Sequence, residues 1–202
     1  MNSPAAIDLS NRESYPGFDV YRRVILEDTA VTYGEMLMRL YEDPEDKCFF
    51  EPVFRTESGL VLRQPGRDVG WLNIDTKEGD HEVNRLVMEA TTDQQPLVDK
   101  FMDLSDLVDR KTDTKSSERK LQKYDLGTAL MRHTDPGLRS RHITLSGTGK
   151  YSTFDSRVEG RRLAEIDLGP GDMVWTDDHT PHSVKQTGDK PRLTLGLIDY
   201  AA

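Results

Sequence analysis

Residues 141–176 read RHITLSGTGKYSTFDSRVEGRRLAEIDLGPGDMVWT, and this stretch decides the fold class. Short apolar segments alternate in it with turn sequences, Ser146-Gly-Thr-Gly and Gly169-Pro-Gly-Asp, that end one strand and precede the next. The same pattern continues on both sides and predicts strands over 121–126, 128–134, 141–147, 150–156, 161–168, 172–176, 182–187 and 192–199. About eight short strands in roughly 80 residues indicate an antiparallel barrel or sandwich, with jelly-roll topology as the leading candidate.

The first half of the chain combines helical periodicity with two short strand-like segments. Apolar residues there recur at helical intervals, and Thr32 and Glu35 have the spacing of a capping box. The predicted elements are a helix from Thr32 to near Pro44, strands over 48–54 and 59–63, a helix over 83–90, and a helix over 97–108 that begins near Pro96.

The segment Arg110–Lys120 is too polar to belong to a core, and the sequence predicts that it forms a mobile loop; whether it closes as a lid is left open. No repeat or flexible linker divides the chain. We therefore expect a mainly β fold with flanking helices (α+β) and a single domain over 1–202. Within it, residues 1–120 form a helical and mixed part that buttresses a β core over 121–202.

Composition excludes several classes of protein. The 202 residues carry a net charge of -9 and a single cysteine, Cys48, which excludes an internal disulfide framework. No apolar run approaches the length of a membrane span, and the start, Met1–Asp8, lacks the basic and apolar regions of a secretory signal. We expect a cytoplasmic protein without a membrane partner. The acidic balance disfavours nucleic acid as a partner, although the arginine-rich middle suits an anionic small molecule.

The chemistry-bearing residues gather in the second half. His133-Thr-Asp135 places an imidazole and a carboxylate two residues apart, so both can point to one face at the end of a strand. His182 follows Asp135 by 47 residues and stands where a later strand begins. Two imidazoles and one carboxylate on neighbouring strands are the facial triad of non-haem Fe(II) oxygenases. Such a triad leaves metal positions open for a chelating co-substrate and O2.

Arg192-Leu-Thr194 comes ten residues after His182. On a strand, Arg192 and Thr194 share a face. A guanidinium beside a hydroxyl is suited to binding a carboxylate through charge-assisted hydrogen bonds.

At these residues the chain resembles the Fe(II)/2-oxoglutarate-dependent dioxygenases of the double-stranded β-helix (cupin-like) superfamily. That family's pattern runs Tyr-x-x-Gly, His-x-Asp, a spacer of several tens of residues, His, and Arg-x-Ser/Thr. The corresponding segments here are Tyr124-Asp-Leu-Gly127, His133-Thr-Asp135, Pro181-His-Ser-Val184 and Arg192-Leu-Thr194. The resemblance covers roughly the last two-fifths of the chain.

The resemblance implies a double-stranded β-helix core and a role for each matching residue. His133, Asp135 and His182 would be the Fe(II) ligands. Arg192 would bind the distal carboxylate of 2-oxoglutarate, and Thr194 and Tyr124 would hydrogen-bond it. The carboxylate of Asp135 favours hydroxylation, desaturation or ring formation over halogenation, because related halogenases have Gly or Ala there. The implied enzyme consumes O2 and releases succinate and CO2.

Several alternatives remain open. His179 competes with His182 as third ligand, and Lys150 competes with Arg192 as the anchor of 2-oxoglutarate. His142 is interpreted as a packed or hydrogen-bonded residue on a strand. Arginines near the expected mouth favour a small anionic or zwitterionic substrate such as an amino acid or a natural-product intermediate: Arg132, Arg139, Arg141, Arg157, Arg161 and Arg162. A nucleobase or a protein side chain is a second class of substrate, and a non-redox metal-binding or ligand-binding module is the alternative to an enzyme. The oligomeric state is left open.

Overall fold

The computed structural model describes residues 6–41, 53–55, 61–63, 69–76, 95–116, 118–124, 126–127, 129–158 and 160–200. The helix predicted over 83–90 lies outside the described residues, as do His81, Cys48 and the predicted helix end near Pro44. Neither of the α-helices described in these ranges is long and apolar enough to cross a membrane.

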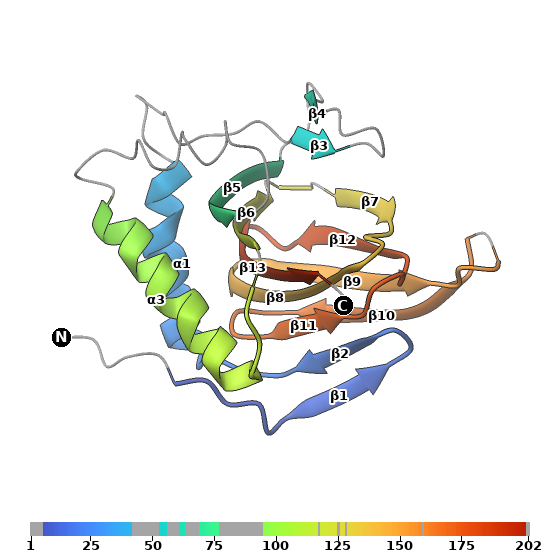
Figure 1. Cartoon of the computed structure of the whole chain (residues 1–202), viewed down its shortest axis with the longest axis horizontal. Coiled ribbons are helices and arrows are strands. Elements are labelled where there is room, and N and C mark those ends of the chain that lie inside the picture. The colour runs from blue at the N-terminus through green and yellow to red at the C-terminus, as the bar shows by residue number, and fades with distance from the viewer. Residues whose placement is uncertain are drawn as a thin grey trace.

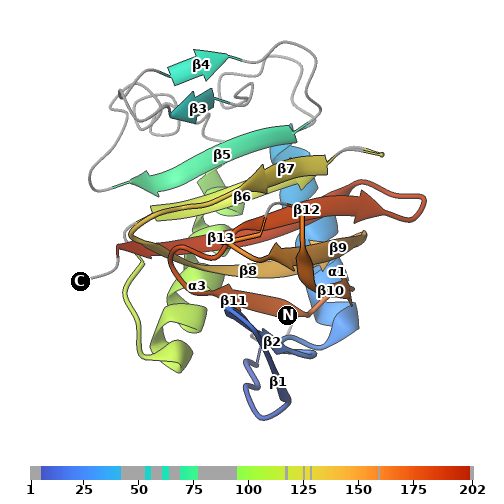
Figure 2. The same ribbon diagram turned by 90° about the vertical axis from the view of Figure 1, so that its right-hand side faces the viewer.

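Two antiparallel sheets face each other (Figures 1 and 2). The larger has the order β1-β2-β11-β8-β13-β6-β5, and the smaller has the order β10-β9-β12-β7. Their strands are β1 (Arg12–Tyr15), β2 (Phe18–Tyr21), β5 (Val69–Thr76), β6 (Glu118–Tyr124), β7 (Ala129–His133), β8 (Leu138–Ser146), β9 (Thr148–Phe154), β10 (Arg162–Leu168), β11 (Met173–Thr176), β12 (His182–Thr187) and β13 (Arg192–Tyr200).

The eight strands β6–β13 form a double-stranded β-helix. Each strand is followed by one in the other sheet, except that β9 and β10 pair as a hairpin within the smaller sheet; β6, β8, β11 and β13 thus lie in one sheet and β7, β9, β10 and β12 in the other. This is the jelly-roll arrangement found in cupins. All eight strands predicted over 121–199 overlap these elements, which confirms the predicted fold class.

The helices cover the outer face of the larger sheet (Figure 1). They are α1 (Glu27–Met38), which continues as a 3₁₀ turn over Arg39–Tyr41, and α3 (Gln95–Thr112). Along β13, Leu193, Leu195 and Leu197 pack against them, because alternate residues of a strand point to the same face. Ile143 and Leu145 of β8 join the same cluster. The first apolar core therefore lies between the helices and the sheet.

A second cluster fills the space between the two sheets. It includes Tyr124 of β6, Tyr151 of β9, Val174 of β11 and Val184 of β12. The Tyr151 hydroxyl lies 2.6 Å from Thr176 Oγ1 and so links the small sheet to the large one. The interior of the barrel is therefore packed at this level.

Three strands of the larger sheet were not predicted. β1 and β2 form a hairpin that pairs with the edge of β11, and β5 pairs with β6 at the opposite edge. The predicted strands of the first half overlap β3 (Val53–Arg55) and β4 (Val61–Arg63), which pair with each other as a separate two-stranded sheet.

The predicted start of the first helix is wrong. α1 begins at Glu27, five positions before Thr32, and the Thr32 hydroxyl donates a hydrogen bond to the Asp28 carbonyl inside the helix. Glu27 and Asp28 occupy the first turn, where acidic side chains favour a helix N-terminus. The buried residues Ala30, Gly34 and Leu37 recur at helical intervals, as the sequence predicted, but the helix itself begins more than one turn earlier.

The mobile loop predicted over Arg110–Lys120 is also wrong. α3 continues to Thr112, and β6 begins at Glu118, so most of this polar stretch belongs to regular structure. Polar side chains of this stretch form buried hydrogen bonds, which composition alone does not reveal. Asp109 is buried, and its carboxylate accepts hydrogen bonds from the backbone and the hydroxyl of Ser116.

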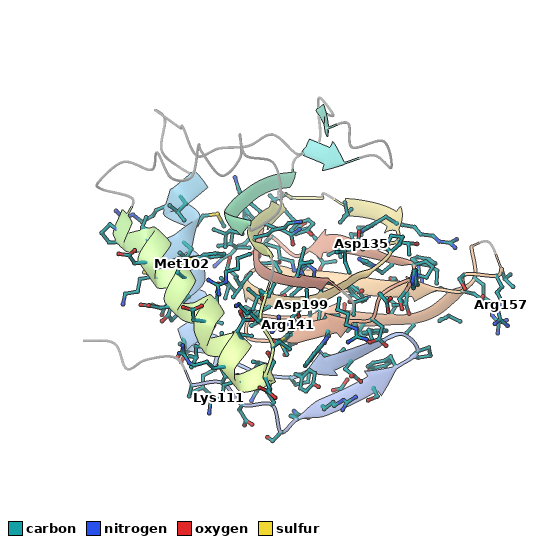
Figure 3. All side chains as sticks on the ribbon, in the orientation of Figure 1. Met102, Lys111, Asp135, Arg141, Arg157 and Asp199 are labelled. Carbon is teal, nitrogen blue, oxygen red and sulfur yellow. The ribbon has the colours of Figure 1, made fainter. Side chains whose placement is uncertain are left out.

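The predicted position of Arg141 near the mouth of the barrel is wrong. Its side chain is fully buried and points to the helix side of the larger sheet, 3.0 Å from Asp109 Oδ1 and 2.8 Å from Asp199 Oδ2. Figure 3 labels Arg141 and Asp199 next to each other, beside α3. The guanidinium thus ties α3 to β8 and β13. Burial of a charge is tolerated when it is paired in this way.

Arg141→Met should lower the free energy of unfolding by about 3–5 kcal/mol, because it removes the cation that bonds Asp199 and leaves buried Asp109 with only its 3.4 Å contact to Arg119. Arg139→Met is the matched control: Arg139 lies two residues earlier on β8 and is exposed, so its loss should change stability by less than about 0.5 kcal/mol. Urea unfolding followed by circular dichroism measures both. Equal effects of the two substitutions would contradict a structural role for the buried pair.

Candidate metal centre

The structure brings His133, Asp135 and His182 together at one end of the barrel. His133 ends β7, Asp135 follows in the connection to β8, and His182 begins β12, opposite His133 in the strand register. One ligand atom from each residue lies within 4.8 Å of the other two. The Nε2 atoms of His133 and His182 are 3.6 and 3.8 Å from Asp135 Oδ2. This is a converging set of two imidazoles and one carboxylate.

The orientation of His182 is fixed by its neighbours. Its Nδ1 lies 2.9 Å from the Thr180 carbonyl oxygen, which places the proton on Nδ1 and the lone pair on Nε2, toward Asp135. The Tyr151 ring stacks against the imidazole at a centroid distance of 5.4 Å. Burial, and then the charge of His133, lower the pKa of His182 below its ordinary 6.5. The neutral imidazole is the form that binds a metal.

His179 lies apart from this set. It stands in the connection before β12 with a left-handed backbone (φ 65°), and its side chain is 70% exposed. Its Nε2 is 3.4 Å from Asp178 Oδ2, and the described cluster of possible metal ligands does not include it. The geometry therefore favours His182 over His179 as a ligand.

Arg192 is the second notable feature of the barrel interior. It begins β13, is 2% exposed, and lies with its guanidinium 5.4 Å from the centre of the Tyr124 ring. Its Nη2 donates to Thr144 Oγ1 at 3.0 Å. A Cβ added at Gly149 would come within 2.9 Å of Arg192 Cδ, so the glycine makes room for the side chain.

Among the residues that the structure describes, no carboxylate forms an ion pair with Arg192. Its Nη1 is buried without a hydrogen-bond partner, as is Thr194 Oγ1 on the same face of β13. Burial lowers the pKa of Arg192, but a guanidinium stays protonated under ordinary conditions. A buried cation without a counter-charge is costly. The site is therefore suited to an anionic ligand that reaches both Arg192 and Thr194.

Lys150 is excluded from that role by its position. Buried residues alternate with it along β9, and its side chain points outward, where Nζ lies 3.3 Å from Glu165 Oε1 and 3.2 Å from Asp167 Oδ1. The ammonium group thus has its own carboxylate partners on β10. The alternative of Lys150 as the anchor of a ligand in the barrel does not fit this placement.

Four of the other five arginines suggested by the sequence gather at the end of β7, β9 and β10. Arg132 lies over the Phe154 ring at 5.3 Å and donates to the Asp155 carbonyl. Arg157 stands on the β9–β10 connection, which projects from the barrel in Figure 3, and Arg161 approaches Asp155 at 3.7 Å. These groups, with Arg162 at the start of β10, give this end of the barrel a cationic border.

Sequence reasoning missed two contributors to the interior. Thr144, which contacts Arg192, and Gln122, whose Oε1 is buried without a partner among the described residues, were not singled out. Gln122 lies two residues from Tyr124 on β6, and Thr144 lies two residues from His142 on β8. Alternate residues of a strand share a face, and this alternation could have pointed to both.

Comparisons with known proteins give a distant likeness. No protein-family model and no curated protein matches the chain. A single-residue mutant of Bacillus subtilis oxalate decarboxylase has 21% identity over 45% of this chain and 23% of that chain, with a TM-score of 0.37. A deletion mutant of the same enzyme has 15% identity over 70% of this chain and 30% of that chain, with a TM-score of 0.42.

The formate complex of Lactobacillus farciminis oxalate decarboxylase has 17% identity over 42% of this chain and 25% of that chain, with a TM-score of 0.36. The chain thus spans less than a third of the length of these proteins. Its own strand order, rather than these similarities, defines its fold.

His182→Ala should lower the affinity of the protein for Mn(II) by about 100-fold or more, since even loss of a residue that only orients a ligand costs 10–100-fold. His179→Ala should leave that affinity within about twofold, because its imidazole points away from the cluster. Isothermal titration of metal-free protein with Mn(II) measures both. A loss confined to the His179 variant would reassign the third ligand.

Proposed function

We propose that the protein is an Fe(II)- and 2-oxoglutarate-dependent oxygenase that oxidises an unactivated C–H bond of a small substrate. The observation that carries the proposal is the buried guanidinium of Arg192, which has no carboxylate partner among the described residues and lies in the same barrel interior as the His133, Asp135 and His182 cluster. A metal-binding module alone has no need of such a cation. An enzyme that binds a dianionic 2-oxo acid does.

The donor set fits Fe(II). Two imidazole nitrogens and one carboxylate oxygen within 4.8 Å are the ligands that this ion takes in non-haem oxygenases. When bound, Fe(II) with 2-oxoglutarate supplies O2 activation: one oxygen atom enters the substrate C–H bond and the other enters succinate, with release of CO2. The protein contributes the binding and orientation of the reactants.

Each residue of the chain has a definite task in this proposal. His133, Asp135 and His182 would hold the metal, and the Thr180 carbonyl would keep the His182 lone pair directed at it. Arg192 would bind the distal carboxylate of 2-oxoglutarate through its free Nη1. Because the guanidinium already contacts Thr144 and the Tyr124 ring, it is preorganised and loses little side-chain freedom on binding.

Thr194 would donate its unpaired hydroxyl to the same carboxylate. The Tyr124 ring lies against the guanidinium and would support Arg192, and its hydroxyl would hydrogen-bond the co-substrate as the resemblance implies. The apolar cluster around Tyr151 and Val184 would keep water from the far side of the bound co-substrate.

The substrate that we propose is small and anionic or zwitterionic, such as an amino acid or a natural-product intermediate. The cationic border formed by Arg132, Arg157, Arg161 and Arg162 supports this, since it would attract a negative group toward the metal end of the barrel. A nucleobase or a protein side chain is the second class within the same chemistry. O2 is the remaining partner.

Anaerobic addition of Fe(II) and 2-oxoglutarate to the purified protein should produce the weak visible charge-transfer band of the metal chelate. His133→Ala should abolish the band, because it removes one of three ligands. Metal binding without a band in the wild-type protein would leave only a metal-binding module and would overturn the oxygenase proposal. When the band is present, release of succinate identifies candidate substrates.

Arg192→Gln should raise the Kd of 2-oxoglutarate by about 100-fold, the usual size of losing one charged partner in a buried site. Lys150→Gln is the matched control, and its Kd should stay within about twofold, since Lys150 faces outward. Unlike Arg141, Arg192 has no carboxylate partner in the part of the chain that the structure describes, so its loss should not destabilise the metal-free protein. An unchanged Kd in the Arg192 variant would show that 2-oxoglutarate does not bind at Arg192.

A further inference from the structure

His142 and Gln122 are polar side chains in the barrel interior that neither the metal cluster nor the Arg192 site uses. His142 stands on β8 and Gln122 on β6, with β13 between them. A Cβ added at Gly196 would lie 3.2 Å from His142 Nδ1 and 3.6 Å from Gln122 Oε1. The imidazole and the carboxamide therefore converge over Gly196, where the missing side chain of β13 leaves space for both.

Both side chains have unused hydrogen-bonding capacity. Gln122 is 2% exposed, and its Oε1 has no partner among the described residues. Neither ring nitrogen of His142 hydrogen-bonds to another residue that the structure describes. Buried polar groups are ordinarily paired. Buried Gln122 beside the half-buried His142, on the face that also carries Arg192 and Thr194, indicates a place for a polar ligand.

His142 lies between the anion site and the metal cluster, and Gln122, which is opposite Thr194 in the register, reaches toward it over Gly196. Arg192 hydrogen-bonds Thr144, which is two residues from His142 on β8, so the backbones of Thr144 and His142 are about 7 Å apart along the strand. That separation is comparable with the length of an extended five-carbon dicarboxylic acid. On the other side, His182 and His133 are close enough for their charges to act on His142.

His142 is neutral in this environment. Burial, followed by the positive charges of His182 and Arg192, lowers the pKa of His142 from its ordinary 6.5 to about 3. A neutral imidazole keeps one donor and one acceptor, and a carboxamide likewise offers both. Such groups can hydrogen-bond a carboxylate without adding a positive charge between a metal and a guanidinium.

We infer that His142 and Gln122 bind the 1-carboxylate and 2-oxo end of the co-substrate, opposite the end bound by Arg192. The inference rests on the proposed function and extends it: the 2-oxo acid is held at both ends by the larger sheet, by a cation at one and by a neutral pair at the other. His142 is then a contact residue for the 2-oxo acid, not a metal ligand and not a packing residue.

The test compares two probes on Mn(II)-loaded protein by isothermal titration. 2-Oxoglutarate has both ends, whereas 2-oxobutyrate has the 2-oxo acid end but no distal carboxylate. His142→Phe, which keeps the ring without its hydrogen bonds, should weaken both probes by about 10–100-fold, the size of a lost hydrogen bond to a charged group. Arg192→Gln should weaken 2-oxoglutarate alone.

Gln122→Met is the second variant and should weaken both probes in the same direction, since it keeps the shape of the side chain and removes its amide. His179→Phe, on the exposed loop before β12, is the matched control and should change neither. Each variant is first checked for an unchanged thermal unfolding midpoint and an unchanged Mn(II) affinity, and only folded variants are compared.

Three results overturn the inference while the proposed function stands. They are unchanged binding of both probes in the His142 and Gln122 variants, a loss confined to 2-oxoglutarate, and a loss of Mn(II) affinity in His142→Phe, which would make His142 a metal ligand. If wild-type Mn(II) protein binds neither probe, the proposed function itself fails, and the inference fails with it.

Discussion

β13 carries three leucines on the face toward the helices, and Arg192, Thr194 and Gly196 on the face toward the barrel interior. This alternation is the constraint on which the rest depends, because a shift of one residue in register would exchange the two faces. The leucines would then no longer pack against the helices, and the guanidinium of Arg192 would no longer face the barrel interior. The energy of burying the core therefore holds the ligand-binding side chains in place. Stability and site are set by the same strand.

The two fully buried arginines illustrate how charge separates a structural role from a binding role. Arg141 has Asp109 and Asp199 as partners, and this network joins α3 to the sheet. Arg192 has an aromatic ring and a hydroxyl, but no carboxylate among the described residues. The first charge is neutralised within the chain, while the second is left for a ligand. Burial alone would have ranked the two arginines equally; their partners distinguish them.

The sequence predicted the eight core strands because period-two alternation and turn residues are local signals. It also predicted which residues would form the His133, Asp135 and His182 cluster, since the strand ends where they stand could be located. It could not predict that β1, β2 and β5 extend the sheet, because edge pairing depends on distant partners. Nor could polarity alone show that Asp109 is buried: the nearer in space of its two cations, Arg141, lies 32 positions further along the chain. Both predictions failed because the contacts involved join residues far apart in the sequence.

The least predictable part of the site is made by side chains that are absent. Gly149 leaves room for the stem of Arg192, and Gly196 leaves room for His142 and Gln122. In the sequence, both glycines look like turn or strand-weakening residues, and only the packed barrel shows what a Cβ there would meet. Gly196 lies on a strand paired with those of His142 and Gln122, so backbone pairing fixes that gap, whereas Gly149 faces Arg192 from the opposite sheet. The polar groups of the interior are thus held by rigid strands rather than by loops, which is the arrangement that favours precise binding of a small ligand.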